Sequence, residues 1–303
     1  MRKIMIYNRQ KLKMIRKKKG FTLIELLVVI SIIALLMSIF MPALRNVRNQ
    51  AKSSICMSNL HEWAMVFNMY TGDNDGFFGE GWYPDGLEHQ WMKTLKKLYK
   101  DEKLLLCPTA TIPMFDIGEG GGVLLGPGWN NNKHAAWGRF PPNGLWDDII
   151  DGYEDAIGSY GLNEWISNVP RGSGNSYYKE EIHWRRTYVR KAAQIPVLSD
   201  CWWMGGFPTP WDEPVEYTTQ MLWSPEIARY TIDRHNGAVN MLFVDYSVKH
   251  VGLRQLWQLQ WSKEYVEGTK IPAWGNLNIV PDPEDPLVWP EWMRKFKNYK
   301  LGF

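Results

Sequence analysis

The sequence predicts an α+β protein in which a long N-terminal transmembrane-plus-amphipathic helix packs on a small antiparallel β-sheet domain with long loops. Three observations predict this class. An uncharged apolar run lies near the N-terminus, a helical apolar repeat continues beyond it, and short β-rich segments separated by glycine and proline follow. With 303 residues, of which 45% are hydrophobic, the chain is long enough for a buried core and too apolar for general disorder.

Positive charge is concentrated at the N-terminus. Residues 1–20 contain nine Lys and Arg and no acidic side chain, which leaves 26 basic and 32 acidic side chains, a net charge of −6, in residues 21–303. Nucleic-acid-binding domains usually present a basic surface. The acidic remainder therefore disfavours such a function, and we expect no nucleic acid partner.

The apolar run, Leu26–Leu44, holds 19 consecutive uncharged residues. As a helix rising ~1.5 Å per residue, it nearly matches the ~30 Å hydrocarbon core of a bilayer. The Lys and Arg that precede it place residues 1–20 in the cytoplasm and residues 45–303 across the membrane. The run is long for a cleaved signal peptide and ends without a clear A-x-A site, so we expect a single-pass anchor.

Glu25 lies at the start of this apolar run. A carboxylate in the bilayer core costs on the order of 2.5–3.5 kcal/mol and is by default a functional candidate. A positive group that meets it, such as a free α-amino group of an adjacent subunit, would make it tolerable. Glu25 is therefore a candidate assembly residue.

The segment Lys19–Ile30, KGFTLIELLVVI, resembles the prepilin signal of type IV pilins and type II secretion pseudopilins. The resemblance implies that a prepilin peptidase cuts between Gly20 and Phe21 and methylates Phe21, and that Glu25 pairs with the N-terminal amine of a neighbouring subunit. It also implies a bacterial inner-membrane protein with a periplasmic or extracellular C-terminal domain. The implied partners are other pilin or pseudopilin subunits and an inner-membrane assembly platform.

The helical pattern continues beyond the apolar run. Apolar residues recur mainly at three- and four-residue spacings, with charged residues between them, at Leu44, Val47, Ala51, Ile55, Leu60, Ala64 and Phe67. No glycine interrupts the pattern before Gly72, so we expect a helix from about Thr22 to Tyr70, kinked at most at Pro42. The Asp- and Asn-rich residues 71–76 that follow favour a C-cap and turn over a Ca²⁺ site near Asp73 and Asp75.

The exported part reads as a loop-rich β domain. The expected division is a basic leader 1–20, a transmembrane helix 21–44, its amphipathic continuation 45–72, an exported domain 73–261 with a loop insertion 109–157, and a Pro/Trp-rich tail 262–303. The expected elements are a short helix 91–99, a strand-like run 104–108, and strands 159–163, 195–200, 238–244 and 247–251. Eight glycines within 118–144 predict a surface loop.

Scattered blocks in this domain resemble a pseudopilin-like group that carries a His-x9-Asp-Gly signature near its C-terminus. The blocks are Cys56 with Ser58–Leu60, Cys107-Pro108, Tyr160–Asn163, Ser199-Asp200, and Arg234–Gly237 with Phe243–Asp245. His235 and Asp245 have the spacing of the signature. Tyr246 stands where glycine is usual, which departs from the pattern at a turn.

Catalytic and metal-binding motifs are not recognisable in the sequence. His235 with Asp245 and Asp200 could suggest acid–base or metal chemistry, but two strand positions ten apart need not face each other, and no second His lies at ligand spacing. We therefore expect His235 and Asp245 to bracket a strand and to bond to backbone or to each other. We expect no enzyme activity, metal or cofactor.

The resemblance implies a structural subunit of a type II secretion pseudopilus or type IV pilus-like filament. The large insertion and the tail would hinder tight helical packing and so favour a minor subunit. The alternative is a membrane-anchored surface-binding module for carbohydrate, with exposed tryptophans from residues 129–146 and 202–223 as its platform. The simpler interpretation of the seventeen tryptophans is that they fill the core.

Three cysteines lie beyond the apolar run, on the exported side, where disulfides are permitted. Cys56 lies on the predicted helix, and Cys107 ends a strand-like run expected to pack against it. One expectation is a Cys56–Cys107 disulfide, with Cys201 free. Two ordinary buried thiols are an equal alternative, because cysteine is common in cores.

Overall fold

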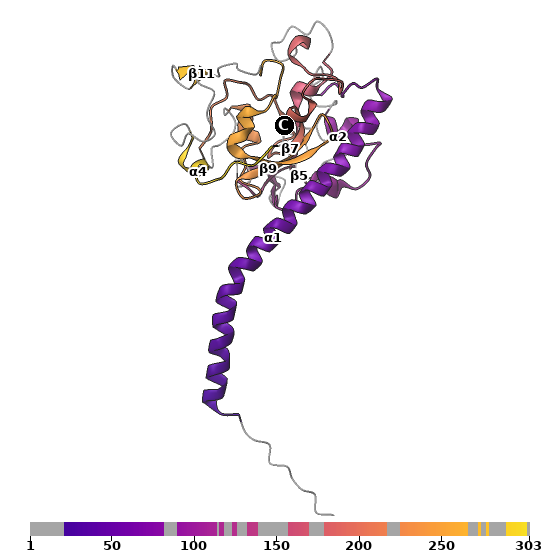
Figure 1. The fold of residues 1–303 in the computed structure, drawn as a ribbon. Coiled ribbons are helices and arrows are strands. Elements are labelled where there is room, and N and C mark those ends of the chain that lie inside the picture. The colour runs from indigo at the N-terminus through magenta and orange to yellow at the C-terminus, as the bar shows by residue number, and fades with distance from the viewer. Residues whose placement is uncertain are drawn as a thin grey trace, which may run out of the picture. The chain divides into compact units, whose positions relative to one another are not determined.

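The computed structural model shows a long helix followed by a β-rich domain (Figure 1). It describes residues 21–81, 90–113, 115–117, 123–125, 132–138, 157–169, 179–216, 225–265, 272–273, 277–278 and 289–301. The chain divides into two compact units, Met1–Val47 and Arg48–Phe303. The predicted α+β class is confirmed.

Helix α1, Leu23–Asp73, is 51 residues long and runs through Pro42 without interruption. Its N-terminal part is long and apolar enough to cross a membrane, judged by length and composition. Every described side chain of the first unit is exposed, as expected for residues whose surroundings are lipid. The expected helix is confirmed, and it ends three residues later than predicted.

A turn closes α1. The Gly76 N–H donates to the Thr71 carbonyl at 2.8 Å, while Asp75 and Gly76 adopt left-handed φ angles of 51° and 78°. This is the backbone conformation that caps helices. The structure therefore places a C-cap and turn at residues 71–76, as the sequence favoured.

The main sheet of the second unit has five strands in the order β10-β9-β7-β6-β8. Its strands are β6 Tyr160–Asn163, β7 Pro196–Asp200, β8 Gly205–Gly206, β9 Ala238–Phe243 and β10 Val248–Gly252. Strands β6, β7, β9 and β10 pair antiparallel, whereas the short β8 runs parallel to β6. The strands predicted at 159–163, 195–200, 238–244 and 247–251 are confirmed, and each end lies within one residue of its predicted position.

The remaining strands are short. They are β1 Ile112–Pro113, β2 Phe115–Ile117, β3 Val123–Leu125, β4 Ala135–Gly138, β5 Ile157–Gly158, β11 Pro272–Ala273 and β12 Leu277–Asn278. Strand β4 lies between β1 and β5, and its four residues are all buried. The expectation of a surface loop is therefore wrong for residues 135–138. The glycines at 118–122 lie outside the described residues.

The helices of the second unit are mostly single turns. They are α2 Trp91–Thr94, η1 Glu102–Leu105, η2 Glu164–Ile166, η4 Glu180–Ile182, η5 Ala192–Gln194, η6 Glu226–Arg229, η7 Leu253–Gln258 and α4 Glu291–Arg294. The predicted helix 91–99 is regular only as far as Thr94. The strand predicted for 104–108 is wrong, because the Asp101 carboxylate accepts a hydrogen bond from the Lys103 N–H and starts the 3₁₀ turn η1 instead.

The buried face of α1 begins in the middle of the helix. The buried residues are Cys56, Leu60, Trp63, Ala64, Val66, Phe67 and Thr71. The predicted apolar stripe is right at Leu60, Ala64 and Phe67. It is wrong at Ala51 and Ile55, which are exposed, because α1 turns Ser53 and Cys56 toward the domain instead, and the Asn240 side chain donates to the Ser53 carbonyl at 3.1 Å.

Tryptophans fill the core of the domain. Trp137, Trp202 and Trp203, which the carbohydrate-binding alternative needed at the surface, are buried. The Trp137 indole N–H donates to the Tyr160 carbonyl at 2.9 Å, so the polar edge of the ring is also satisfied internally. Trp211 differs, because 56% of its surface is exposed.

The described end of the tail, residues 289–301, packs against the domain. Trp289 and Met293 are buried, and the Trp289 ring meets the Trp257 ring edge-on at 5.2 Å. The Gln255 side chain donates to the Tyr299 carbonyl at 2.6 Å and accepts from the Tyr299 N–H at 2.9 Å. The tail is thus fastened to η7 by both apolar and backbone contacts.

Candidate functional site

The N-terminus of α1 carries a reciprocal cap. The Thr22 N–H and hydroxyl donate to Glu25 Oε2 at 2.8 and 2.7 Å, and the Glu25 N–H donates to the Thr22 hydroxyl at 3.3 Å. This is the T-x-x-E capping box, which satisfies two orphan donors of a helix start. The capping role of Thr22 was not predicted, although the T-x-x-E pattern of residues 22–25 is present in the sequence.

The predicted processing residues flank this cap. Phe21 is 71% exposed, and Gly20 lies outside the described residues. Glu25 directs its carboxylate back along its own chain to Thr22, the residue after Phe21. The predicted cut between Gly20 and Phe21 would therefore create an amine next to the residue that holds this carboxylate.

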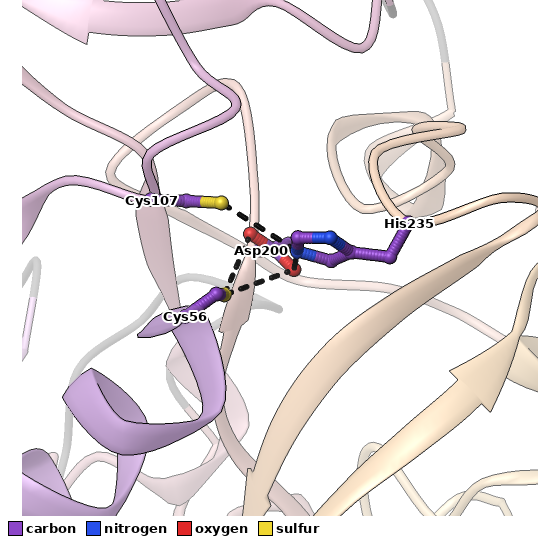
Figure 2. A group of neighbouring side chains, drawn as sticks. All are labelled: Cys56, Cys107, Asp200 and His235. Atoms are coloured by element: carbon purple, nitrogen blue, oxygen red, sulfur yellow. Dashed lines mark hydrogen bonds and ion pairs between the residues drawn. The ribbon is translucent and has the colours of Figure 1, made fainter. Parts of the chain in front are cut away.

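A second candidate site lies inside the Arg48–Phe303 unit. Cys56 from α1, Cys107 after η1, Asp200 at the end of β7 and His235 just before β9 point toward one another (Figure 2). All four are buried, and their potential ligand atoms lie within 4.8 Å of each other. Four distant segments of the chain therefore meet at one buried polar cluster.

Asp200 is the centre of this cluster. Its Oδ1 and Oδ2 each lie 3.6 Å from Cys56 Sγ, and its Oδ2 lies 3.0 Å from His235 Nε2. Cys107 Sγ lies 3.5 Å from the same Nε2 atom. The cluster thus has one nitrogen and one carboxylate facing two sulfurs.

Three further groups hold the cluster from outside. Arg234 Nη1 donates to Asp200 Oδ1 at 3.1 Å, and the Asn240 N–H donates to Asp200 Oδ2 at 2.8 Å. The Tyr160 hydroxyl donates to Cys56 Sγ at 3.3 Å. A buried carboxylate needs such partners, because an unpaired charge in the core is very costly.

Burial and neighbouring charges shift the pKa values of these groups in different directions. Burial disfavours charge on the Asp200 carboxyl, but His235 and Arg234 outweigh it and hold the Asp200 pKa well below its usual range. Burial also disfavours a charged His235, yet Asp200 raises the His235 pKa to about 9. Burial raises the pKa of Cys56, whereas hydrogen bonds from Cys56 and His235 outweigh burial at Cys107 and lower its pKa to about 6.

The geometry differs from that of a Cys–His–Asp catalytic triad. In a triad the carboxylate holds one imidazole nitrogen while the other nitrogen faces the nucleophile. Here Asp200 and Cys107 both face Nε2 of His235, and Nδ1 has no hydrogen-bond partner among the described residues. A substrate would also have to reach side chains that are fully covered. The cluster is therefore arranged for binding or structure rather than for nucleophilic catalysis.

The predicted disulfide is not formed in the structure. Cys56, Cys107 and Cys201 are all free, and the first two instead contact Asp200 and His235. Cys201 is separate from the cluster, and its Sγ accepts from the Trp203 N–H at 3.3 Å. Burial raises the Cys201 pKa to about 12.

The two signature residues do not meet. His235 turns to Asp200, whereas the Asp245 carboxylate accepts from the N–H and hydroxyl of Ser247 at 3.0 and 2.6 Å. The expectation that His235 and Asp245 bracket a strand is confirmed, since β9 lies between them. Asp245 shapes the turn, and His235 belongs to the cluster.

The sequence does not predict that these four side chains meet. Its members are far apart in the chain, so no short ligand motif such as Cys-x-x-Cys could reveal it. The available signal was that Cys56, Cys107, Asp200 and His235 each fall in one of the blocks that resemble the pseudopilin-like group.

The donor set limits what these residues could hold. Thiolates and imidazole suit Zn²⁺ and other transition metals, whereas Ca²⁺ and Mg²⁺ require oxygen ligands. Cys56, Cys107 and His235 therefore favour a soft or borderline divalent ion, with Asp200 supplying the fourth ligand.

Comparison with known proteins gives a family-model match in the N-terminal segment. Residues 15–41 match the family model of the prokaryotic N-terminal methylation motif. The chain is also similar to the type IV wide pilus major component PilA4 of Thermus thermophilus, with 40% identity over 62 residues, which are 20% of this chain and 47% of that protein. The chain thus spans about half the length of this curated relative. No solved structure matches the chain.

Proposed function

We propose that this chain, whose N-terminal segment carries the methylation motif of type IV pilin-like proteins, is cut after Gly20, methylated on Phe21 and assembled as a filament subunit. The match at residues 15–41 and the similarity to a pilus component support this role. The proposed machine is a type II secretion pseudopilus or a type IV pilus-like filament, and the proposed role is that of a minor, non-enzymatic subunit.

The observation that carries this proposal is Glu25 near the start of an uninterrupted apolar helix. A cut after Gly20 would remove nine positive charges and create an ammonium group four residues before Glu25. In the monomer the Glu25 carboxylate is satisfied by Thr22. In the filament it would exchange these bonds for the N-terminal amine of a neighbouring subunit, a charge-assisted contact that is stronger in lipid.

The proposed location follows from the same features. Residues 1–20 lie on the cytoplasmic side before processing, α1 anchors the chain in the inner membrane, and the domain beyond it is periplasmic or extracellular. The proposed partners are the prepilin peptidase, other pilin or pseudopilin subunits and the assembly platform of the inner membrane.

Intact mass and N-terminal sequencing of the mature protein test the processing step. The expected product begins at Phe21 and is heavier by one methyl group than the unmodified chain. Replacing Gly20 with a bulky residue, in Gly20→Trp, should leave full-length precursor. A mature protein that starts at Met1, or beyond Ala43, would overturn the proposal.

Crosslinking in membranes tests the assembly step. Glu25→Ala should insert at least as well as wild type, because a charge is removed from lipid. It should lose the subunit–subunit crosslinks, because the N-terminal amine of the neighbouring subunit then has no carboxylate to pair with. Glu62→Ala, an exposed acid on the same helix beyond the apolar run, is the matched control and should crosslink normally. Wild-type crosslinks in Glu25→Ala would exclude the charge-pair mechanism.

A further inference from the structure

We propose that Cys56, Cys107, Asp200 and His235 form a structural Zn²⁺ site that fastens helix α1 to the β domain. The ligands come from four separate segments, namely α1, the residues after η1, the end of β7 and the turn before β9 (Figure 2). One ion bound there would tie these segments together at the centre of the core. This inference is independent of processing and assembly at the N-terminus.

Two of the distances between these side chains match those of a tetrahedral zinc centre. With Zn–S near ~2.3 Å and Zn–N and Zn–O near ~2.1 Å, tetrahedral geometry separates sulfur from nitrogen or oxygen by about 3.6 Å, and nitrogen from oxygen by about 3.4 Å. The structure has Cys107 Sγ 3.5 Å from His235 Nε2 and Cys56 Sγ 3.6 Å from Asp200. The Nε2–Oδ2 distance, 3.0 Å, is shorter than the tetrahedral value and would lengthen, and all four ligand atoms lie within 4.8 Å of one another.

Charge also balances around a divalent ion. Cys56 and Cys107 would bind as thiolates and His235 as a neutral imidazole, with the protons that these groups carry released to solvent, so that Cys56, Cys107 and Asp200 contribute three negative charges. The Zn²⁺ ion and the fully buried guanidinium of Arg234, 3.1 Å from Asp200, contribute three positive charges. The loaded site is therefore neutral as a whole, which a core with no access to water requires.

The surrounding groups would orient the ligands. Arg234 and the Asn240 N–H each occupy one side of the Asp200 carboxylate, and the Tyr160 hydroxyl donates to Cys56 Sγ. Such outer contacts fix ligand geometry and commonly change metal affinity by about 10–100-fold.

A bound ion would stabilise a domain whose strands and helices are short. Among the residues that the structure describes, the sheet strands are at most six residues long, and the helices beyond α1 are single turns apart from η7, which has six residues. A structural ion that binds the folded state and not the unfolded chain adds stability according to its affinity and concentration. Closed four-ligand sites of this kind serve structure rather than catalysis, because no coordination position remains open.

The metal content of the full chain tests the proposal. The protein is purified in detergent under reducing conditions, without chelator, and its metals are measured by mass spectrometry. We expect about one Zn²⁺ per chain. Cys56→Ser and Cys107→Ser should each reduce it at least about tenfold. Cys201→Ser is the matched control, because Cys201 is equally buried but outside the cluster, and it should keep its zinc.

Measurements on wild-type protein keep the test decisive should the serine variants fold poorly. A strong chelator should lower the melting temperature by roughly 5–15 °C, and added Zn²⁺ should restore it. Co²⁺ added to the metal-free chain should produce the absorption of a tetrahedral cobalt–thiolate centre. Tyr160→Phe, which removes one hydroxyl from Cys56, should keep this spectrum but weaken metal affinity about tenfold.

Three results would overturn the proposal. The first is wild-type protein that carries no transition metal and shows no cobalt–thiolate absorption on titration. The second is zinc that survives in both Cys56→Ser and Cys107→Ser. The third is an unreduced mass lower by two hydrogens together with one remaining labelled thiol, which would show a Cys56–Cys107 disulfide in place of the metal.

Discussion

Tyr246 occupies a position in the β9–β10 turn where the backbone favours glycine. Its φ is +65°, and its N–H donates to the Phe243 carbonyl at 2.9 Å, as in a type I turn followed by a left-handed residue. The glycine usual in the resembling group would suit this conformation. The Tyr246 hydroxyl meets the Thr71 hydroxyl of α1 at 2.7 Å, which offsets part of the backbone strain.

Substitutions at Tyr246 should separate these two effects. Tyr246→Gly and Tyr246→Ala both lose the ring and the hydrogen bond, but only glycine relieves the strain, so the glycine variant should be more stable than the alanine variant by about 1–2 kcal/mol. Tyr246→Phe keeps the ring and should lose about 1 kcal/mol relative to wild type. Urea unfolding measures all three. Equal stability of the glycine and alanine variants would contradict a strained turn.

His250 should make the protein sensitive to mild acid. Its Nδ1 hydrogen bonds to Asn240 Oδ1 at 2.8 Å, and burial, the largest cause, lowers its pKa to about 4. The unfolded value is about 6.5, so the unfolded chain takes up the proton first. The free energy of unfolding should therefore fall as pH drops from about 6.5 to about 4.

A matched pair of variants isolates this effect. His250→Gln keeps a polar amide near Asn240 but cannot protonate, so its unfolding free energy should decline less over the same pH range. His61→Gln, an exposed histidine of α1, should follow the wild-type pH profile. The role of His250 is refuted if both variants decline alike.

At the residue scale, the sequence indicates which individual residues are of interest better than it indicates which residues they contact in the fold. The proposed roles of Phe21 and Glu25 rest on a continuous motif, because all its parts lie within a few residues. Cys56, Asp200 and His235 could be singled out, but their meeting depends on how β7 and β9 pair and on which face α1 presents. Those are properties of the folded chain, so the local sequence does not contain them.

Among the elements, the β4–β5 pair depends on one glycine. Trp137 of β4 faces Gly158 of β5 in register, and a Cβ at Gly158 would overlap the buried Trp137 indole. Gly158→Ala should therefore cost at least about 2 kcal/mol of unfolding free energy. Gly72→Ala, in α1 with open space around it, is the control and should be neutral or up to about 1 kcal/mol more stable. Similar losses in both variants would contradict a steric role for Gly158.

Strands and short helices differ in how well the sequence predicts them. β7 and β9 are predicted because their apolar and β-branched residues form continuous runs bounded by turn residues. η1 is not, because a single capping contact from Asp101 converts an apolar run into a 3₁₀ turn. β4 is not, because Ala135 and Ala136 are small and become strand residues only through their pairing with Ile112 and Pro113.

For the whole molecule, processing should reverse the net charge. The chain as read has a net charge of +3 and a pI near 8.6, whereas residues 21–303 carry −6. Isoelectric focusing should therefore show the precursor as a basic species and the mature protein as an acidic one. Gly20→Trp, which should not be cut, should stay at the basic position. A mature protein that focuses with its precursor would mean that residues 1–20 remain attached.

The buried face of α1 also sets an order of events during synthesis. Thr71 leaves the ribosome 175 residues before Tyr246, its partner in the β9–β10 turn. At about 5–20 residues per second, this delay is roughly 10–35 seconds. Until then the positions of α1 that carry Cys56 and Thr71 lack their partners Asp200 and Tyr246, so the nascent helix is only partly covered. An anchor that enters the membrane first would keep each such chain apart from its copies until the last strands arrive.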